Sequence, residues 1–167
     1  PRYEELLRDI FNRKVVADDC SLYLHRPTAT DPSLAPPGCD TFYVLSPVPN
    51  LRGGADWDSI AESYRAKVEK RLEETVLPGL GAALTTSRIM TPHTFRDELL
   101  SLHGAAFSIE PKLLQSAWFR PHNRSEELAG LYLVGAGTHP GAGLPGVLSS
   151  ARIVDALVAE DWPQAAA

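Results

Sequence analysis

The stretch Leu131-Tyr-Leu-Val-Gly135-Ala-Gly137-Thr-His139-Pro140-Gly141-Ala-Gly143-Leu-Pro145-Gly146 decides how the last part of this chain folds. It predicts a short apolar strand over 131–134, a turn made of glycines, and a helix over 147–159 with a proline at its start. Glycines in such a turn let backbone N–H groups approach a phosphate or the polar edge of a ring without intervening side chains. The stretch is therefore a candidate binding element.

Residues 141–146 match the dinucleotide pattern G-x-G-x-x-G, but the match is a weak one. It does not directly follow the predicted strand, and no second strand is predicted after the helix. The acidic residue near the expected distance, Asp155, falls inside the helical pattern instead of at a strand end. The pattern favours a strand–turn–helix unit that closes a cofactor site built mostly by other residues.

Composition limits the classes of protein to which the chain can belong. A length of 167 residues, 44% hydrophobic and 22% charged, is typical of one globular domain. The net charge of −5, with no run of Lys or Arg, argues against nucleic acid as the main partner. No apolar stretch approaches the roughly 20 residues of a membrane span. The start at Pro1-Arg2-Tyr3 suggests a fragment or a processed chain. Cys20 and Cys39 are expected to be buried or half-buried free thiols.

The periodicity of apolar residues predicts a mixed sheet covered by helices. Asp56 is the expected N-cap of a long amphipathic helix, and Thr91-Pro92 is expected to open a short one. The 27–40 loop is long enough to be functional or pinned to another part of the protein, and 101–124 is expected to be irregular. The expected helices cover 3–11, 57–76 and 91–100, and the expected strands cover 20–26, 41–48 and 84–90.

Few residues carry chemistry by pattern alone. The sequence has no Gly-x-Ser-x-Gly turn and no phosphate-binding Walker loop. Its histidines lack the spacing of metal ligands, so no metal site is predicted. Glu110 and His103 are candidates for proton transfer, although either could simply hydrogen-bond its own loop. Asp97 and Glu98 are further candidates, and Arg96 and Arg120 are expected to be structural ion-pair partners.

Several blocks of sequence, taken together and in order, carry a resemblance to a known family. The chain resembles the C-terminal third of bacterial and fungal-type phytoene desaturases, which are flavoenzymes of the amine-oxidase-like superfamily. The resemblance covers nearly all 167 residues, and its last three blocks are the most specific. The blocks are Ser21–His25, Asp31–Pro36, Tyr43–Pro49, Thr91–Asp97, His103–Pro111, Gln115–Asn123 and Leu131–Val147.

The resemblance implies FAD-dependent desaturation of phytoene, in which a hydride leaves for the flavin and a proton leaves the neighbouring carbon. In such a reaction Glu110 and His103 are the candidate catalytic residues that would take the proton, and Trp118 and Phe119 either line a hydrocarbon tunnel or belong to the core. A helix N-terminus, which carries about half a positive charge, would suit the pyrimidine edge of a reduced flavin. The implied FAD-binding residues are Gly135, Ala136, Gly137, Gly143, Leu144, Pro145, Gly146 and Val147.

The fold class implied is α/β with α+β character, a part of a larger enzyme. Residues 1–125 would be mainly substrate-binding, and 126–167 would belong to a Rossmann-like FAD domain whose N-terminal portion is absent here. The parent would sit on the cytoplasmic side of a membrane surface, as a peripheral protein, because its substrate dissolves in lipid. The isolated chain would expose apolar surface and self-associate. Two alternatives stay open: another carotenoid or retinoid flavoenzyme (isomerase, ketolase or saturase), or a non-enzymatic binding module.

Overall fold

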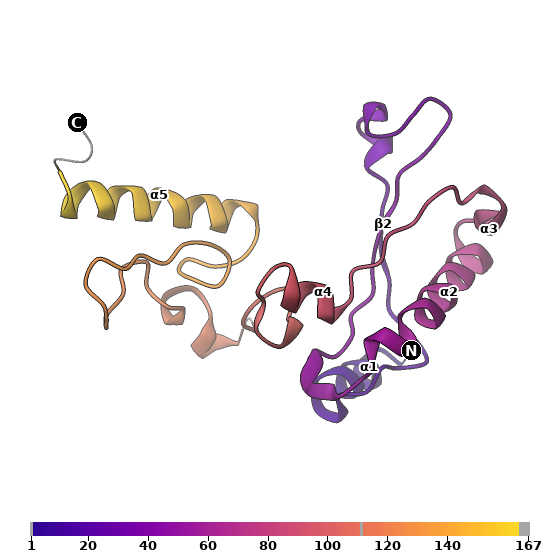
Figure 1. Cartoon of the computed structure of the whole chain (residues 1–167), viewed down its shortest axis with the longest axis horizontal. Helices are drawn as coiled ribbons and strands as arrows, with labels where there is room; N and C mark the ends of the chain where they lie inside the picture. The colour runs from indigo at the N-terminus through magenta and orange to yellow at the C-terminus, as the bar shows by residue number, and fades with distance from the viewer. Residues whose placement is uncertain (1, 111, 164–167) are drawn as a thin grey trace. The chain divides into compact units, whose positions relative to one another are not determined.

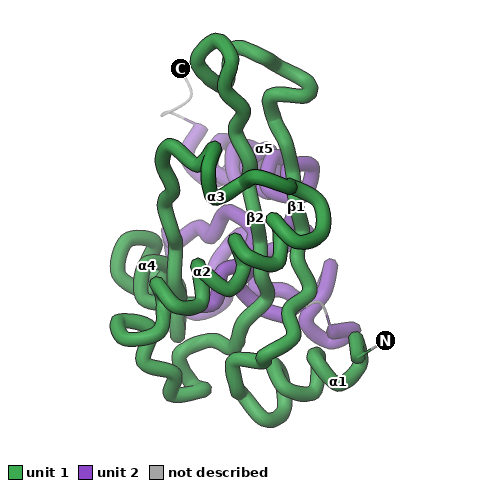
Figure 2. Tube along the Cα trace, turned by 90° about the vertical axis from the view of Figure 1, so that its right-hand side faces the viewer, with its two compact units in different colours: residues 1–104 green, residues 105–167 purple. Residues whose placement is uncertain are grey.

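The computed structural model describes residues 2–110 and 112–163, which form two compact units (Figure 2). The first unit covers 1–104 and the second covers 105–167. This division rests on contacts within the chain. The expected division at 125/126 concerns function, and it stays a prediction.

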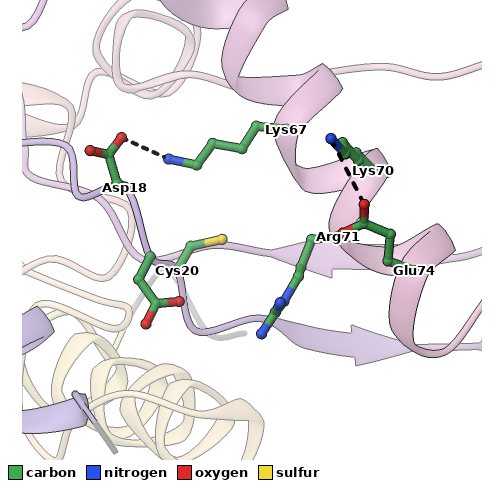
Figure 3. Close-up of a pocket in the computed structure, with 7 residues that line it drawn as sticks. Asp18, Cys20, Lys67, Lys70, Arg71 and Glu74 are labelled. Carbon is green, nitrogen blue, oxygen red and sulfur yellow. Dashed lines mark hydrogen bonds and ion pairs between the residues drawn. The ribbon is translucent and has the colours of Figure 1, made fainter.

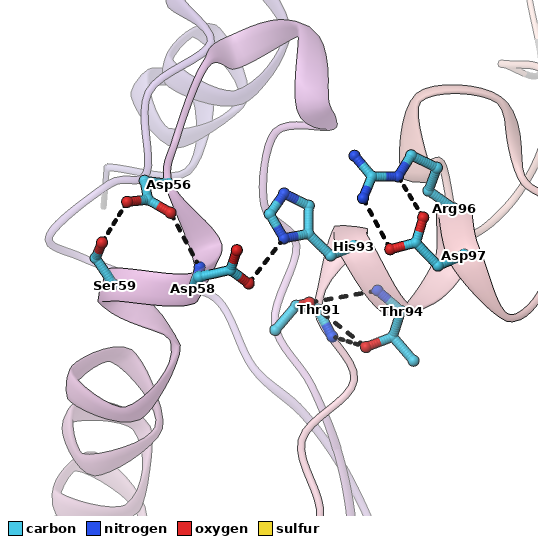
Figure 4. Close-up of polar contacts among 8 residues, drawn as sticks. All are labelled: Asp56, Asp58, Ser59, Thr91, His93, Thr94, Arg96 and Asp97. Atoms are coloured by element: carbon cyan, nitrogen blue, oxygen red, sulfur yellow. Dashed lines mark hydrogen bonds and ion pairs between the residues drawn. The ribbon is translucent and has the colours of Figure 1, made fainter.

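Two helices of the first unit, α2 and α4, begin where side chains cap them (Figure 4). The carboxylate of Asp56 accepts hydrogen bonds from the backbone N–H of Asp58, at 3.2 Å, and from the Ser59 hydroxyl, which starts α2 (Trp57–Thr75). Thr91 and Thr94 form a reciprocal capping box at the start of α4 (Pro92–Asp97). Both predicted caps are confirmed. The remaining helices of this unit are α1 (Tyr3–Arg8), which continues as a π-helical turn over Asp9–Arg13, and α3 (Leu80–Ala83).

The sheet is a two-stranded antiparallel hairpin of β1 (Tyr23–His25) and β2 (Tyr43–Leu45), with Leu24 opposite Val44. Both strands fall inside the predicted ranges and are shorter than expected. The strand predicted over 84–90 is wrong, because the described residues give this segment no strand partner. It is instead tethered to α2, where Arg65 Nη1 donates to Ser87 Oγ at 3.1 Å. The wider fold class, with its Rossmann-like parent domain, stays a prediction.

The apolar core of the first unit is small. Its buried hydrophobic side chains are Leu6, Ile10, Trp57 and Leu72. Tyr64 of α2 packs edge-on to Trp57, with ring centroids 5.8 Å apart, and its hydroxyl bonds Ser46 Oγ at 2.7 Å. Burial raises the pKa of Tyr64. These contacts attach α2 to the residues that follow β2.

Cys20 and Cys39 are free thiols, as predicted, but Cys39 is exposed and not buried. Among the described residues, no helix is both long and apolar enough to cross a membrane.

The second unit consists of 3₁₀ turns at Leu113–Gln115 and Ala117–Phe119, then loops, then α5 (Leu144–Asp161) (Figure 1). The helix starts three residues before the predicted 147. The predicted strand over 131–134 is reduced to a single bridge between Arg124 and Tyr132. At the other end of α5, Arg124 donates to the Asp161 carboxylate at 2.8 and 3.0 Å, and this contact holds the bridge to the helix.

Polar side chains fill the interior of this second unit. Within 105–110 and 112–163 no hydrophobic side chain is buried, whereas Arg120, Asn123, Thr138 and Ser150 are. Some apolar side chains are half-buried, among them Ile153, Val154, Leu157 and Val158 of α5, and many others are exposed, as the sequence predicted. The exposed ones include Leu113, Leu114, Leu128, Leu131, Val134, Leu144 and Leu148.

Candidate functional site

The glycine turn folds directly against the first turn of α5. A Cβ atom added at Gly146 would lie 2.5 Å from the carbonyl oxygen of Gly141, closer than real Cβ atoms come to any neighbour. Gly141 has a φ of +140°, which side chains rarely allow, and a Cβ there would meet Arg120 Nε at 3.3 Å. The backbone of the turn at Gly141 therefore packs directly against the backbone of α5 at Gly146, and only glycine fits at these two positions.

The N-terminus of α5 is open. Its N-cap is Gly143, no side chain caps the helix, and its first turn carries no acidic residue. The first N–H groups of a helix have no partner within the helix, and the helix dipole adds partial positive charge there. In α2 and α4 the side chains of Asp56 and Thr91 satisfy such groups. In α5 the backbone N–H groups of Leu144 and Gly146 are available to an anion or a polar ring edge, while Pro145 has no N–H and that of Val147 binds the Gly143 carbonyl.

A polar cluster holds the turn on its inner side. Ser150, which is completely buried in α5, places its Oγ 2.9 Å from Asn123 Nδ2, 3.1 Å from the Gly135 backbone nitrogen and 3.0 Å from Thr138 Oγ1. Thr138 Oγ1 in turn lies 3.0 Å from the Gly135 carbonyl oxygen. We call Asn123, Thr138 and Ser150 the polar cluster. None of the three was predicted from the sequence, and no pattern there separates the buried Ser150 from its exposed neighbour Ser149.

Residues 117–123 run along the turn and bind its backbone. The Arg120 guanidinium is buried, and its Nη1 donates to the Ala136 carbonyl at 2.6 Å. The His139 backbone N–H donates to the Pro121 carbonyl at 3.0 Å, and the His139 ring contacts the Ala117 carbonyl through Nδ1 at 3.0 Å. Arg120 was expected to be an ion-pair partner. Its hydrogen bond instead goes to a carbonyl of the turn, so its role is to hold the backbone.

A groove of about 700 Å³ lies beside this segment. It brings together the two predicted substrate-binding residues, Trp118 and Phe119, whose exposed fractions are 66% and 56%. The Trp118 ring lies 4.7 Å from the His122 ring and 6.0 Å from the His139 ring, centroid to centroid. The rest of the lining is Arg120, Pro121, Arg124, Ser125, Glu126, Glu127, Leu128, Leu131 and Leu133.

The predicted catalytic residues belong to different compact units. Glu110 is 41% exposed and its carboxylate pairs with Lys112 Nζ at 2.5 Å. His103 is exposed and has left-handed backbone, with a φ of 55°. The Arg96 guanidinium holds the Asp97 carboxylate at 2.5 and 2.8 Å and lowers the pKa of that carboxyl, which makes Asp97 a poor proton acceptor. The roles of Glu110 and His103 stay predictions.

A second hollow, of about 180 Å³, lies in the first unit between α2 and the residues before β1 (Figure 3). Its charged side chains largely pair with one another: Lys67 Nζ lies 3.2 Å from Asp18, and Lys70 Nζ lies 3.8 Å from Glu74. Across 2–110 and 112–163, no three His, Cys, Asp or Glu side chains gather as metal ligands. This hollow offers no chemistry comparable to that of the glycine turn.

Comparison with known proteins gives the chain close relatives. It is 59% identical over 160 residues to a neurosporene-forming phytoene desaturase of Rhodobacter capsulatus, and 57% identical over 162 residues to a lycopene-forming one of Pseudescherichia vulneris. It is 42% identical over 159 residues to a 4,4'-diapophytoene desaturase of a Methylomonas species. These alignments cover 95–96% of the chain and 30–33% of the relatives. No protein-family model matches the chain.

The relatives define a class, the desaturases of carotenoid chains. Within that class the chain is most similar in sequence to phytoene desaturases, and it spans about a third of the length of the curated relatives it matches. The expected resemblance is therefore confirmed, and the share of length agrees with a C-terminal third.

Proposed function

We propose that this chain is the part of an FAD-dependent carotenoid desaturase that closes the flavin site, and that the full-length enzyme introduces double bonds into phytoene or a close analogue. One observation carries the proposal. The open N-terminus of α5 stands directly behind a glycine turn, in a chain that aligns along 95% of its length with phytoene desaturases.

The residues present fit a flavin. The backbone at Gly135, Ala136 and Gly137 is partly accessible and would lie along the ribityl–phosphate part, and residues 143–147 would face the pyrimidine edge. FAD would supply the hydride acceptor when bound. The chain's own contribution is to orient that group. The start of α5 places about half a positive charge where reduced flavin gains negative charge.

The aromatic and leucine side chains of the groove beside Trp118 and Phe119 would contact a hydrocarbon, and its charged side chains, which include Arg124 and Glu126, would lie at the polar part of the lining. The names of the relatives cover neurosporene-, lycopene- and diapolycopene-forming enzymes, so the substrate class is proposed only as phytoene or a related carotenoid precursor. Glu110 and His103 remain the proposed proton acceptors.

We also propose that the full-length enzyme works as a peripheral protein at the cytoplasmic surface of a membrane, where its substrate is dissolved. The exposed side chains of Leu113 and Leu114, 82% and 72% accessible, support contact with an apolar surface. For the isolated chain, the same exposed surface favours self-association.

The test uses the full-length enzyme, with its upstream sequence restored. Flavin absorbance and fluorescence measure FAD binding, and chromatography of pigments after incubation with phytoene vesicles identifies the product. Desaturated carotenoids with bound FAD support the proposal. A rearranged, oxygenated or hydrogenated product would select the isomerase, ketolase or saturase alternative. A protein that binds no FAD and converts nothing would leave only the binding module.

A further inference from the structure

The hydrogen bonds of the polar cluster have only one consistent direction. A hydroxyl has one donor and two acceptor sites. Ser150 Oγ accepts from the Gly135 N–H, which can only donate, and from Asn123 Nδ2, the amide's donor end. Both acceptor sites are then filled, so the Ser150 hydroxyl proton points to Thr138 Oγ1. The Thr138 proton points in turn to the Gly135 carbonyl.

The Asn123 amide is equally determined. Its Nδ2 lies 2.9 Å from both the Leu133 carbonyl and Ser150 Oγ, so both of its hydrogens are used. A carboxylate at this position could only accept hydrogen bonds. The Leu133 carbonyl can also only accept, and the single proton of Ser150 Oγ already points to Thr138, so neither group could bond to the carboxylate. Asparagine is therefore the residue that these contacts require, although aspartate has nearly the same shape.

Gly135 is consequently held at both of its polar backbone atoms. Its N–H goes to Ser150 and its C=O goes to Thr138, while the Leu133 carbonyl is held by Asn123. The three side chains are buried, with exposed fractions of 3%, 8% and 0% for Asn123, Thr138 and Ser150. Because these side chains are buried, removing one of them leaves its hydrogen-bond partners unsatisfied, and this costs free energy. The backbone at 133–135 is therefore fixed before any ligand arrives.

We propose that Asn123, Thr138 and Ser150 are positioning residues that hold the 133–135 backbone, and with it the start of the glycine turn, in the shape that receives the cofactor. This inference rests on the proposed function. The cluster connects the turn to Ser150 of α5. It therefore fixes the position of the turn relative to the open N-terminus of that helix. Preorganisation of this kind lowers the cost of binding.

The test compares Ser150→Ala, Thr138→Val and Asn123→Asp in the full-length enzyme. Ser149→Ala is the matched control, since Ser149 is the exposed neighbour on α5. The readouts are the FAD dissociation constant, the absorption spectrum of bound flavin, and the thermal midpoint of the apoprotein. We expect FAD affinity to fall about tenfold for each cluster variant, because each loses two or three buried hydrogen bonds. We expect a shifted flavin spectrum in the cluster variants and no change in the control.

Thr138→Val is nearly isosteric and protects the test against simple misfolding. Ser150→Cys, which keeps a weak donor and acceptor, is expected to restore part of the affinity. Hydrogen exchange at the Gly135 amide is expected to be slow in the wild type and fast in Ser150→Ala. Wild-type dissociation constants and spectra in folded cluster variants would overturn this inference alone. A wild-type enzyme without FAD affinity would overturn the proposed function instead.

Discussion

Replacing Gly146 by alanine tests the close approach of the glycine turn to α5. The added Cβ would lie 2.5 Å from the Gly141 carbonyl oxygen, and since real Cβ atoms keep at least 3.0 Å, the turn or the helix must move by 3.0 − 2.5 = 0.5 Å. Overpacking of this kind costs about 1–3 kcal/mol. The preference of a helix for alanine over glycine returns at most about 1 kcal/mol. The net loss therefore lies between about 0 and 3 kcal/mol, and it falls on the contact between the turn and α5 that shapes the proposed site.

The assay is FAD titration of the full-length enzyme, followed by flavin fluorescence. We expect Gly146→Ala to weaken FAD binding about tenfold, since about 1.4 kcal/mol corresponds to a factor of ten. Gly81→Ala is the matched control, because Gly81 also lies in a helix without positive φ and its Cβ would meet only the flexible end of Glu73, at 3.2 Å. Unchanged FAD affinity in Gly146→Ala, with a thermal midpoint equal to the wild type, would show that this close contact does not shape the FAD site.

Three further predictions concern the chain itself. The isolated chain is expected to bind FAD weakly or not at all. It contains the turn and α5, whereas the resemblance places the rest of the flavin site in upstream sequence. Tight binding with a perturbed flavin spectrum would contradict this. The 27–40 loop is expected to loosen in acid. Hydrogen bonds from Thr28 and Arg26 lower the pKa of Asp40 in the folded chain. The stability that Asp40 contributes is therefore fully present above its unfolded pKa of about 3.9, and it is lost as the pH falls through the lower, folded pKa. Limited proteolysis between pH 6 and 2 measures this, and Thr28→Val should shift the loosening to higher pH. Tyr132→Phe is expected to raise the pKa of Asp161, whose carboxylate accepts the tyrosine hydroxyl at 2.6 Å, and to fray the end of α5; carboxyl NMR shifts that do not move would exclude this contact.

Local signals in the sequence were enough for the starts of α2 and α4, whereas the short helix α3 was not predicted and α4 ends at Asp97, before the predicted 100. Asp56 and Thr91-Pro92 cap helices through contacts within three residues, so the caps of α2 and α4 could be predicted directly. The 84–90 segment has strand-forming residues, but a strand also needs a partner, and strand propensity carries no information about one. Among the described residues, no strand pairs with 84–90.

The candidate site could be predicted only in part, for the same reason. The glycines of the turn are visible in sequence because their backbone demands are local. The burial of Arg120 and Ser150 depends on contacts 16 and 27 positions away along the chain, at Ala136 and Asn123. Neither a serine in a helix nor an arginine after two aromatics signals such contacts. The polar cluster became visible only with the structure.

The polar interior of the second unit has a thermal consequence. Heat-capacity change on unfolding comes chiefly from apolar surface newly exposed to water, and polar surface lowers it. The buried hydrophobic side chains of the described chain, Leu6, Ile10, Trp57 and Leu72, all lie in the first unit. Unfolding of 105–163 should therefore show a small heat-capacity change and a nearly flat stability curve. Cooling would not weaken this half as it weakens a domain held by hydrophobic packing.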